Sequence, residues 1–316
     1  MKRTYKAVAL MLSMMAVGGL AFAGGGADKA AGTKVKEIAF LPPAMISPYY
    51  ASCIKGAEPV AKALGYKLVV ASPEKESDYD SQVRLVEDMI TRGVSGVILC
   101  AINADAIVTA VKKCNAAKIP VVMFNTQDKL AGGVVDCYVK YDQYVGGGKM
   151  ADYVGLKFNG KANVAIIEGL PSVHTTSRMG GFIDQAKKNF PGIKVVATQP
   201  GDWEREKGMN AAANMLQAHP EIDVFFALCD EMGLGAAKAI EQAGAKAKVV
   251  AFDGNPNAIE AVKAGQTLGT LSINGVETGK LCVEALDKII KGEKVDEVIQ
   301  VETVVVTAEN ADQFLN

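Results

Sequence analysis

The sequence predicts an α/β protein made of two doubly wound parallel-sheet lobes. Short apolar runs rich in Val and Ile alternate with longer helical patterns from residue 37 onward. This alternation is typical of a parallel sheet with helices on both faces. The chain of 316 residues is long enough for two domains. No low-complexity linker separates the two halves of the pattern, so we expect the lobes to be joined by short extended segments.

The first half of the pattern predicts five strands and three helices. Gly65 and Gly93 follow two of these helices at the position where a left-handed residue usually ends a helix. Pro59 falls inside the first helix, where it should remove a backbone hydrogen bond and kink the axis. The expected strands are 37–41, 67–71, 96–100, 120–125 and 134–139, and the expected helices are 49–64, 78–92 and 104–117.

The second half repeats the alternation. A last extended run at 301–306 precedes a polar tail. The expected strands are 162–167, 194–199, 223–228, 248–252 and 269–272, and the expected helices are 144–158, 175–188, 204–219, 232–243, 257–264 and 276–291.

The N-terminus has the features of a secretory signal peptide. Lys2, Arg3 and Lys6 precede an apolar run at 7–17, and Ala21-Phe22-Ala23 forms a small-x-small cleavage site. We therefore expect residues 1–23 to be removed after Ala23, with 24–34 as a flexible leader. No cysteine stands at the cleavage point to carry a lipid anchor. The mature protein is expected to be exported to the periplasm.

Composition argues against several classes of function. A net charge of −1 gives no reason to expect nucleic acid or an anionic membrane as a partner. Neither G-x-S-x-G nor H-E-x-x-H occurs, so we assign no catalytic residue. With only two histidines, no Cys/His metal site can be assembled, and we expect neither metal nor cofactor. The six cysteines are widely scattered in apolar contexts and are expected to be mostly free thiols: Cys53, Cys100, Cys114, Cys137, Cys229 and Cys282.

Two local features have a structural and a functional interpretation. The run from Gly146 to Lys149 resembles a phosphate-binding loop, but Met150 stands where a Ser or Thr would bind magnesium. We therefore interpret these glycines as positions of close helix packing. His174 could act as a general base, but we interpret it as a solvated loop residue.

The ends of the predicted strands combine aromatic and hydrogen-bonding side chains. The strand at 248–252 ends at Asp253 and Gly254, and ligands of open α/β sheets bind beyond the carboxyl ends of the strands. Asp253 is thus either a fixed ligand acceptor or a cap of the helix that follows. Such a mixture predicts a cleft for a compact polar ligand, lined by Pro43, Ser47, Tyr49, Tyr50, Cys100, Asn125, Thr126, Arg178, Trp203, Cys229, Phe252, Asp253 and Asn274.

Seven stretches, taken together and in this order, resemble a known family. They are 65–70 (GYKLVV), 91–93 (TRG), 119–122 (IPVV), 178–182 (RMGGF), 199–203 (QPGDW), 229–235 (CDEMGLG) and 249–254 (VVAFDG). Along nearly its whole length the mature chain resembles the periplasmic sugar-binding proteins of the ribose-binding type, which serve ABC importers. The resemblance implies the type I periplasmic binding protein fold, with a three-crossing hinge and the ligand enclosed between the lobes. We expect a monomer with one lobe at 35–141 plus 275–302 and the other at 142–274 plus 303–316.

The resemblance carries over unevenly to the ligand contacts. Arg178, Phe252 and Asp253 keep the residue type of the family, and Tyr49, Tyr50 and Trp203 keep aromatic character. Asn274 shortens a Gln, and Ser47, Cys100 and Cys229 stand where the family has Asn. Asn125-Thr126 replaces an Asp-Arg pair that would clamp sugar hydroxyls. The implied pocket is less polar than a ribose site, which argues against ribose itself.

The function implied is capture of a sugar or sugar-like molecule by hinge closure and its delivery to an ABC permease. Alternative ligands are a nucleoside or a furanose-type signal molecule, and the closed form could instead be presented to a chemoreceptor or sensor kinase. An exported enzyme would have to use His174 with the thiol of Cys100 or Cys229. The lac-repressor relatives of this fold carry a basic DNA-binding module where this chain has its signal peptide, so we do not expect a repressor.

Overall fold

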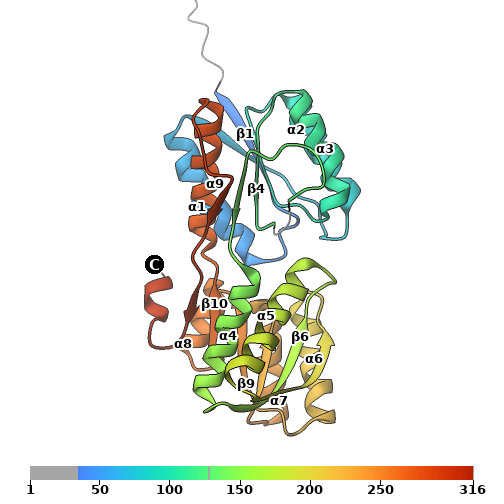
Figure 1. The fold of residues 1–316 in the computed structure, drawn as a ribbon, viewed down its shortest axis with the longest axis vertical. Helices are drawn as coiled ribbons and strands as arrows, with labels where there is room; N and C mark the ends of the chain where they lie inside the picture. The colour runs from blue at the N-terminus through green and yellow to red at the C-terminus, as the bar shows by residue number, and fades with distance from the viewer. Residues whose placement is uncertain (1–34, 127–128, 316) are drawn as a thin grey trace, which may run out of the picture. The chain divides into compact units, whose positions relative to one another are not determined.

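The described residues form two six-stranded sheets, and the first of them contains only parallel neighbours (Figure 1). The computed structural model describes residues 35–126 and 129–315. The order across this sheet is β11-β5-β4-β3-β1-β2. Its strands are β1 (Lys36–Leu41), β2 (Tyr66–Val70), β3 (Val97–Leu99), β4 (Val121–Phe124), β5 (Cys137–Lys140) and β11 (Val298–Gln300).

Among the described residues, four helices cover the two faces of the first sheet. On one face α1 (Pro48–Ala63) packs against α9 (Gly275–Ile290), and on the other α2 (Tyr79–Arg92) packs against α3 (Ala104–Ala116) (Figure 1). The contact between α1 and α9 is very close, because a Cβ at Gly279 would lie 1.8 Å from the carbonyl oxygen of Cys53. A segment from late in the chain thus completes the first sheet and one of its faces.

The second sheet has the order β12-β10-β9-β8-β6-β7, and in the described part of the chain its one antiparallel pair is β10 with β12. Helices α4 (Gln143–Lys157) and α5 (Val173–Asn189) pack on one face, and α6 (Arg205–Ala218), α7 (Asp230–Ala243) and α8 (Pro256–Lys263) on the other. The strands are β6 (Lys161–Glu168), β7 (Gly192–Pro200), β8 (Val224–Ala227), β9 (Lys248–Asp253), β10 (Gly269–Ser272) and β12 (Val304–Val306). The chain ends in a short 3-10 helix at Ala311–Phe314.

Two of the glycines at 146–148 serve close packing, as the sequence predicts for this run. They lie inside α4, and a Cβ at Gly147 would be 2.1 Å from the carbonyl oxygen of Arg178 on α5. Gly146 faces β9 and β10, where a Cβ would come within 2.7 Å of Phe252. These contacts bring α4 close to α5 and to the second sheet.

The described chain passes between the two sheets at three places. β5 of the first sheet leads into α4 beside the second, and β10 of the second sheet leads into α9 beside the first. The third passage is the short segment between β11 and β12. The domain limits given above remain a prediction, since strand membership does not fix where each lobe begins.

The predicted alternation of strands and helices is confirmed, with two corrections. The strand expected at 134–139 begins only at Cys137. The run expected at 301–306 is a strand only at 304–306, which is β12 in the second sheet, and the strand β11 at 298–300 in the first sheet was not predicted. A sequence pattern typical of extended backbone does not indicate which neighbouring strand a segment pairs with. The Val301 N–H donates to the carbonyl of Lys140 in the first sheet, whereas Val304 is paired with Ser272 in the second.

Pro59 is accommodated because it lies on the solvent side of α1. The helix continues through it to Ala63. Both Pro59 and Lys55, whose carbonyl would accept the missing bond, are exposed. Water can therefore satisfy that carbonyl.

All six cysteines are buried free thiols, in line with the expectation from their spacing. Within the described parts of the chain, no helix is both long enough and apolar enough to cross a membrane. The expected signal peptide and leader fall at 1–34, outside the described residues.

Candidate functional site

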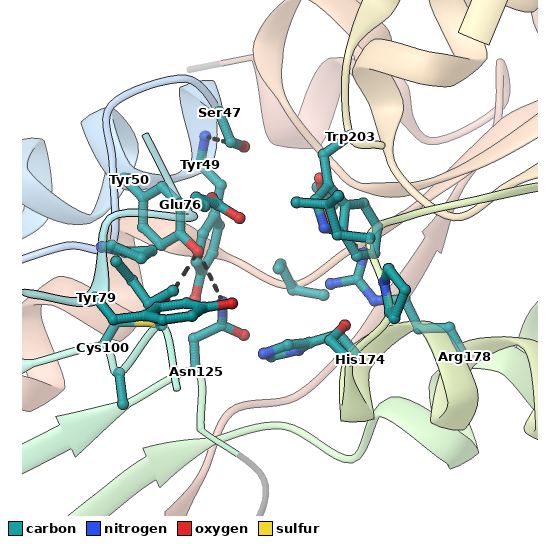
Figure 2. A pocket seen from close by; sticks show the side chains of 18 residues that line it. Ser47, Tyr49, Tyr50, Glu76, Tyr79, Cys100, Asn125, His174, Arg178 and Trp203 are labelled. Carbon is teal, nitrogen blue, oxygen red and sulfur yellow. Dashed lines mark hydrogen bonds and ion pairs between the residues drawn. The ribbon is translucent and has the colours of Figure 1, made fainter. Parts of the chain in front are cut away.

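A cavity of about 120 Å³ lies at the carboxyl ends of strands from both sheets (Figure 2). Segments that follow β1, β2, β3 and β4 line one side. The last residue of β9 and segments that follow β6, β7 and β10 line the other. This is the edge at which open parallel sheets place their ligands. We call this cavity the inter-sheet pocket.

Most of the predicted site residues come together in the inter-sheet pocket. Those that line it are Pro43, Ser47, Tyr49, Tyr50, Cys100, Asn125, Arg178, Trp203 and Asp253. The structure thus collects side chains that are up to 210 positions apart in the sequence, from Pro43 to Asp253.

Arg178 is the most extensively bonded side chain of the pocket. Its exposed fraction is 4%. Nη1 donates to Asp253 Oδ1 at 3.0 Å and to the carbonyl of Leu228 at 2.5 Å. Nε donates to Gln143 Oε1 at 2.6 Å, and Nη2 donates to the Tyr141 hydroxyl at 2.6 Å. Four of the five N–H groups of a guanidinium are therefore used by the protein itself.

The electrostatic environment keeps Arg178 charged. Burial acts to lower the pKa of Arg178. The neighbouring oxygens of Tyr141 and Asp253 raise it, and the pKa as a whole lies above its usual value. The guanidinium also lies over the Phe252 ring, with 4.0 Å between its carbon and the ring centroid. Arg178 is thus a rigid, preorganised group that can offer a ligand one remaining N–H.

Asp253 lies at the end of β9 in a strained backbone conformation. Its φ is 116°, and Gly254 follows at φ 71° with no room for a Cβ, which would meet Ser272 at 2.4 Å. Strain of this kind persists at sites where the surrounding structure imposes it. Burial raises the pKa of Asp253 to about 6, although the charge of Arg178 acts in the opposite direction.

The alternative that Asp253 caps the next helix is wrong. Asn255 is the N-cap residue of α8, and no side chain caps that helix. The carboxylate of Asp253 instead accepts from Arg178 and faces the pocket. The loop after β9 is held by Asp230, which accepts from the Asn255 N–H at 2.6 Å and from the Thr270 hydroxyl at 2.5 Å.

Aromatic rings stand on both sides of the pocket. Tyr49 and Tyr50 lie on the first turn of α1, with ring centroids 5.4 Å apart. Trp203 comes from the loop after β7 and adopts φ 68°. Its ring packs on Gly169, where a Cβ would lie 2.0 Å from the indole. Glycine at this position therefore lets the indole reach the pocket wall.

Gln143 connects the two sides of the pocket. It is fully buried at the start of α4, where its Oε1 accepts from Arg178. Its Nε2 lies 3.5 Å from Asn125 Oδ1 and 2.5 Å from His174 Nδ1. If Nε2 donates to Nδ1, the proton of a neutral His174 is on Nε2, where it can be donated to a ligand.

His174 is not the solvated loop residue that the sequence suggested. It lies on the first turn of α5 and lines the pocket. Burial and the charge of Arg178 lower the pKa of His174 well below its usual range, to about 3, so the ring is neutral at pH 7. The helix begins two residues earlier than the predicted 175, because Ser172 caps it by accepting from the Thr175 N–H.

Four predicted residues do not line the pocket. Phe252 is fully buried beneath the Arg178 guanidinium and supports it from below. The Asn274 side chain caps α9 by accepting from the Glu277 N–H, and the Thr126 hydroxyl donates to the carbonyl of Phe124. The Cys229 thiol is buried and lies 3.9 Å from the Trp203 carbonyl oxygen.

Several lining residues were not anticipated from the sequence. They lie in loops or at helix starts without a periodic pattern and are Glu76, Tyr79, Ala101, Ile102, Leu170, Pro171, Ser172, His174 and Ile273. Tyr141 and Gln143, which hold Arg178, were also missed. Their position after β5, another strand end, is the signal that could have identified them.

The chemistry of the pocket suits binding better than thiol catalysis. Burial raises the pKa of both Cys100 and Cys229 above the usual range of a thiol, whereas a nucleophilic cysteine needs a lowered pKa. His174 cannot act as a base at neutral pH through Nδ1, which already contacts Gln143. Within the two described stretches, no group of three or more potential ligand side chains could hold a metal ion.

A protein-family model described as the periplasmic binding protein domain matches residues 38–294. The chain belongs to this family. The match spans strands of both sheets and every element that contributes to the inter-sheet pocket.

Curated members of the family are similar over most of their length. The chain is 36% identical over 255 residues to the ribose import binding protein of Bacillus subtilis, covering 80% of this chain and 81% of the relative. It is 31% identical over 287 residues to the D-allose-binding periplasmic protein of Escherichia coli, covering 86% of this chain and 92% of that relative.

Solved structures share the fold with high scores. A periplasmic solute-binding protein of Actinobacillus succinogenes with bound D-allose matches at a TM-score of 0.84 and 34% identity, covering 88% of this chain and 99% of the other. A solute-binding protein of Agrobacterium vitis with bound D-fucose matches at a TM-score of 0.81 and 28% identity, covering 88% of this chain and 97% of the other.

Proposed function

We propose that this protein captures a sugar in the inter-sheet pocket and delivers it to an ABC permease. The observation that carries the proposal is the pocket itself, in which Tyr50 and Trp203 stand on opposite sides and Arg178 and Asp253 form a preorganised polar pair. Aromatic faces stack on sugar rings, and fixed polar groups orient the hydroxyls. The names of several relatives, which bind ribose, allose or fucose, support a sugar as the ligand class.

The size of the pocket favours a single-ring ligand. A cavity of about 120 Å³ is smaller than the roughly 300–1,000 Å³ of sites for drug-sized ligands. A monosaccharide fits this size better than a nucleoside, which has a base as well as a sugar. Cys100 in place of an Asn, and Asn125-Thr126 in place of an Asp-Arg pair, argue for a sugar other than ribose.

Capture is proposed to work by closure of the two lobes on the ligand. A ligand that contacts both sides stabilises the closed form more than the open form and so shifts the population. We place the lobes at 35–141 plus 275–302 and at 142–274 plus 303–316, with the three passages as the hinge. We further propose export to the periplasm with cleavage after Ala23, which mass spectrometry of the mature N-terminus would check.

A thermal-shift screen combined with small-angle scattering tests the proposal. The panel contains D-ribose, D-allose, D-arabinose, D-fucose, xylitol and adenosine. We expect at least one monosaccharide to raise the melting temperature and to reduce the radius of gyration. The Asp253→Asn variant should bind that sugar about ten-fold more weakly, because a charge-assisted hydrogen bond is lost. Its melting temperature without sugar measures separately the stability lost by leaving the buried Arg178 without its charge partner. Stabilisation by adenosine alone, or binding without compaction, would contradict the proposal.

A further inference from the structure

We propose that Glu76 determines which sugars bind, by accepting hydroxyl hydrogen bonds on the side of the pocket opposite Trp203. This inference rests on the proposed sugar-binding function. It assigns a role to a residue of the loop between β2 and α2, a segment with no strand or helix pattern. It also answers a question raised by the sequence, since Asn125 and Thr126, the two residues that follow β4 directly, stand where the resemblance leads one to expect an Asp-Arg pair.

The position of Glu76 fits this role. The side chain lines the inter-sheet pocket and is half-buried. Figure 2 shows its carboxylate beside Tyr50 and Ser47, pointing into the space that faces Trp203. The Tyr50 ring lies next to it, so a sugar stacked there would bring its hydroxyls near the carboxylate.

Glu76 differs from Asp253 in having no partner among the residues that the structure describes. Asp253 is paired with Arg178 at 3.0 Å. Within the described residues Glu76 makes no hydrogen bond and no ion pair, although it lies in a largely desolvated pocket. A desolvated carboxylate without a donor is unfavourable. A ligand that supplies hydrogen-bond donors there removes this penalty on binding.

The charges around the pocket define the ligand class. The positive charge of Arg178 is already offset by Asp253, so an ionised Glu76 gives the described lining residues a net negative charge. Acidic sugars such as uronic acids are therefore excluded by repulsion. A neutral sugar with a hydroxyl facing Glu76 is accepted, whereas a deoxy sugar with a methylene or methyl group there leaves the carboxylate unpaired.

The inference makes binding depend on pH. Burial and the charge of Asp253 raise the pKa of Glu76 to about 7, against the opposing effect of Arg178. Hydroxyl donors favour the ionised form. Affinity should therefore be highest above pH 7 and fall as the pH drops through 7 and Glu76 takes up a proton.

The protonation of Glu76 can be distinguished from that of its titratable neighbours. Burial raises the pKa of Tyr50 and Cys100, and His174 is neutral at pH 7. Asp253, with a pKa of about 6, contributes a second step at lower pH. The remaining neighbours on the pocket wall and on the loop are Arg178, Tyr79, Glu74, Lys75 and Asp78.

Calorimetric titration of Glu76→Gln tests the inference with the neutral sugar that stabilises the wild type most. The matched control is Glu74→Gln, an exposed position of the same loop outside the pocket. At pH 8.5 we expect Glu76→Gln to bind about ten-fold more weakly than wild type, the difference between a charge-assisted and a neutral hydrogen bond. At pH 5.5 the two affinities should converge, and Glu74→Gln should follow wild type throughout.

The outcomes separate this inference from the function on which it rests. If the wild type binds none of the sugars, the sugar-capture proposal fails. If the wild type binds a sugar and Glu76→Gln binds it equally well at pH 8.5, the function stands and the role of Glu76 is refuted. Equal binding of the sugar and of its deoxy derivatives at every ring position would also refute it. Melting temperatures of the sugar-free variants verify that both substitutions leave the fold intact.

Discussion

Arg178 is the residue on which the pocket is built. Its guanidinium contacts β9 through Asp253, α4 through Gln143, the end of β8 through Leu228, and the segment after β5 through Tyr141. Only a planar donor that can make bidentate contacts reaches so many acceptors at once, and the ammonium group of lysine is not such a donor. Arg178 therefore supports the pocket structurally and leaves only one N–H for the ligand.

Replacement of Arg178 should destabilise the protein severely. Arg178→Ala leaves the buried Asp253 without its charge partner, and breaking such a pair costs about 3–5 kcal/mol. Urea unfolding at pH 8 measures this loss. At pH 5 the loss should be smaller, because Asp253 can then take up a proton.

Arg205→Ala is the matched control. Arg205 also bonds a carboxylate through two nitrogens, Glu231 at 2.8 and 3.0 Å, but its side chain is 52% exposed. The loss of unfolding free energy in Arg205→Ala should be below about 1 kcal/mol. Equal losses for the two variants would show that the buried network contributes no more than a surface pair.

At the level of elements, the close contact of α4 and α5 positions Arg178. Gly147 on α4 contacts the carbonyl of Arg178, and Gly181 on α5 contacts the carbonyl of Tyr144, where a Cβ would lie 1.9 Å away. Because backbone rather than side chain would meet the added atom, the helices must separate to admit it. The distance between these helices thus sets how far the guanidinium reaches toward Asp253.

Gly181→Ala should therefore reduce stability and sugar affinity together. Overpacking of this kind costs about 1–3 kcal/mol, and displacement of α5 lengthens the Arg178–Asp253 contact. Thermal melts and calorimetric titration measure the two effects.

Gly148→Ala serves as the control for helix propensity. Gly148 lies on the same helix as Gly147, but its nearest atom to an added Cβ is a side-chain carbon of Gln185 at 3.5 Å. This variant should melt at the wild-type temperature or slightly above it, since alanine favours a helix by roughly 1 kcal/mol over glycine. Destabilisation of Gly148→Ala to the same extent would rule out the packing explanation.

At the level of the whole molecule, the two sheets each supply one side of the pocket. The loops at 42–47 and 71–78 follow strands of the first sheet, and those at 169–172 and 201–204 follow strands of the second. Neither side alone surrounds a ligand. Capture therefore depends on both, whichever lobe the sugar meets first.

Hydrogen exchange should reveal this dependence. A sugar that bridges the sides should slow amide exchange in loops of both sheets, because opening then requires loss of the ligand. The last turn of α3, at the opposite end of that helix from Ile102 on the pocket wall, should exchange at the same rate with and without sugar. Protection confined to the loops of one sheet would show that the ligand does not bridge the pocket.

The strand ends made most of the site predictable from the sequence. Parallel strands place their carboxyl ends at one edge, so Pro43, Asn125 and Asp253 could be assigned to one cleft before their distances were known. The alternation of apolar runs was enough to predict the order of elements, because each strand and helix is buried on a periodic set of positions.

The tertiary structure decided the rest, because neighbours across a fold leave no periodic signal. The sequence could not show that Asn274 caps α9 and that Phe252 lies under Arg178. It also gave His174 as a loop residue and did not mark Glu76 at all. Both occupy the pocket because loops from two sheets converge there. The periodic pattern of the sequence depends on the burial of each residue itself. The hydrogen-bond partners and the charge state of a side chain depend on the other chain segments that surround it.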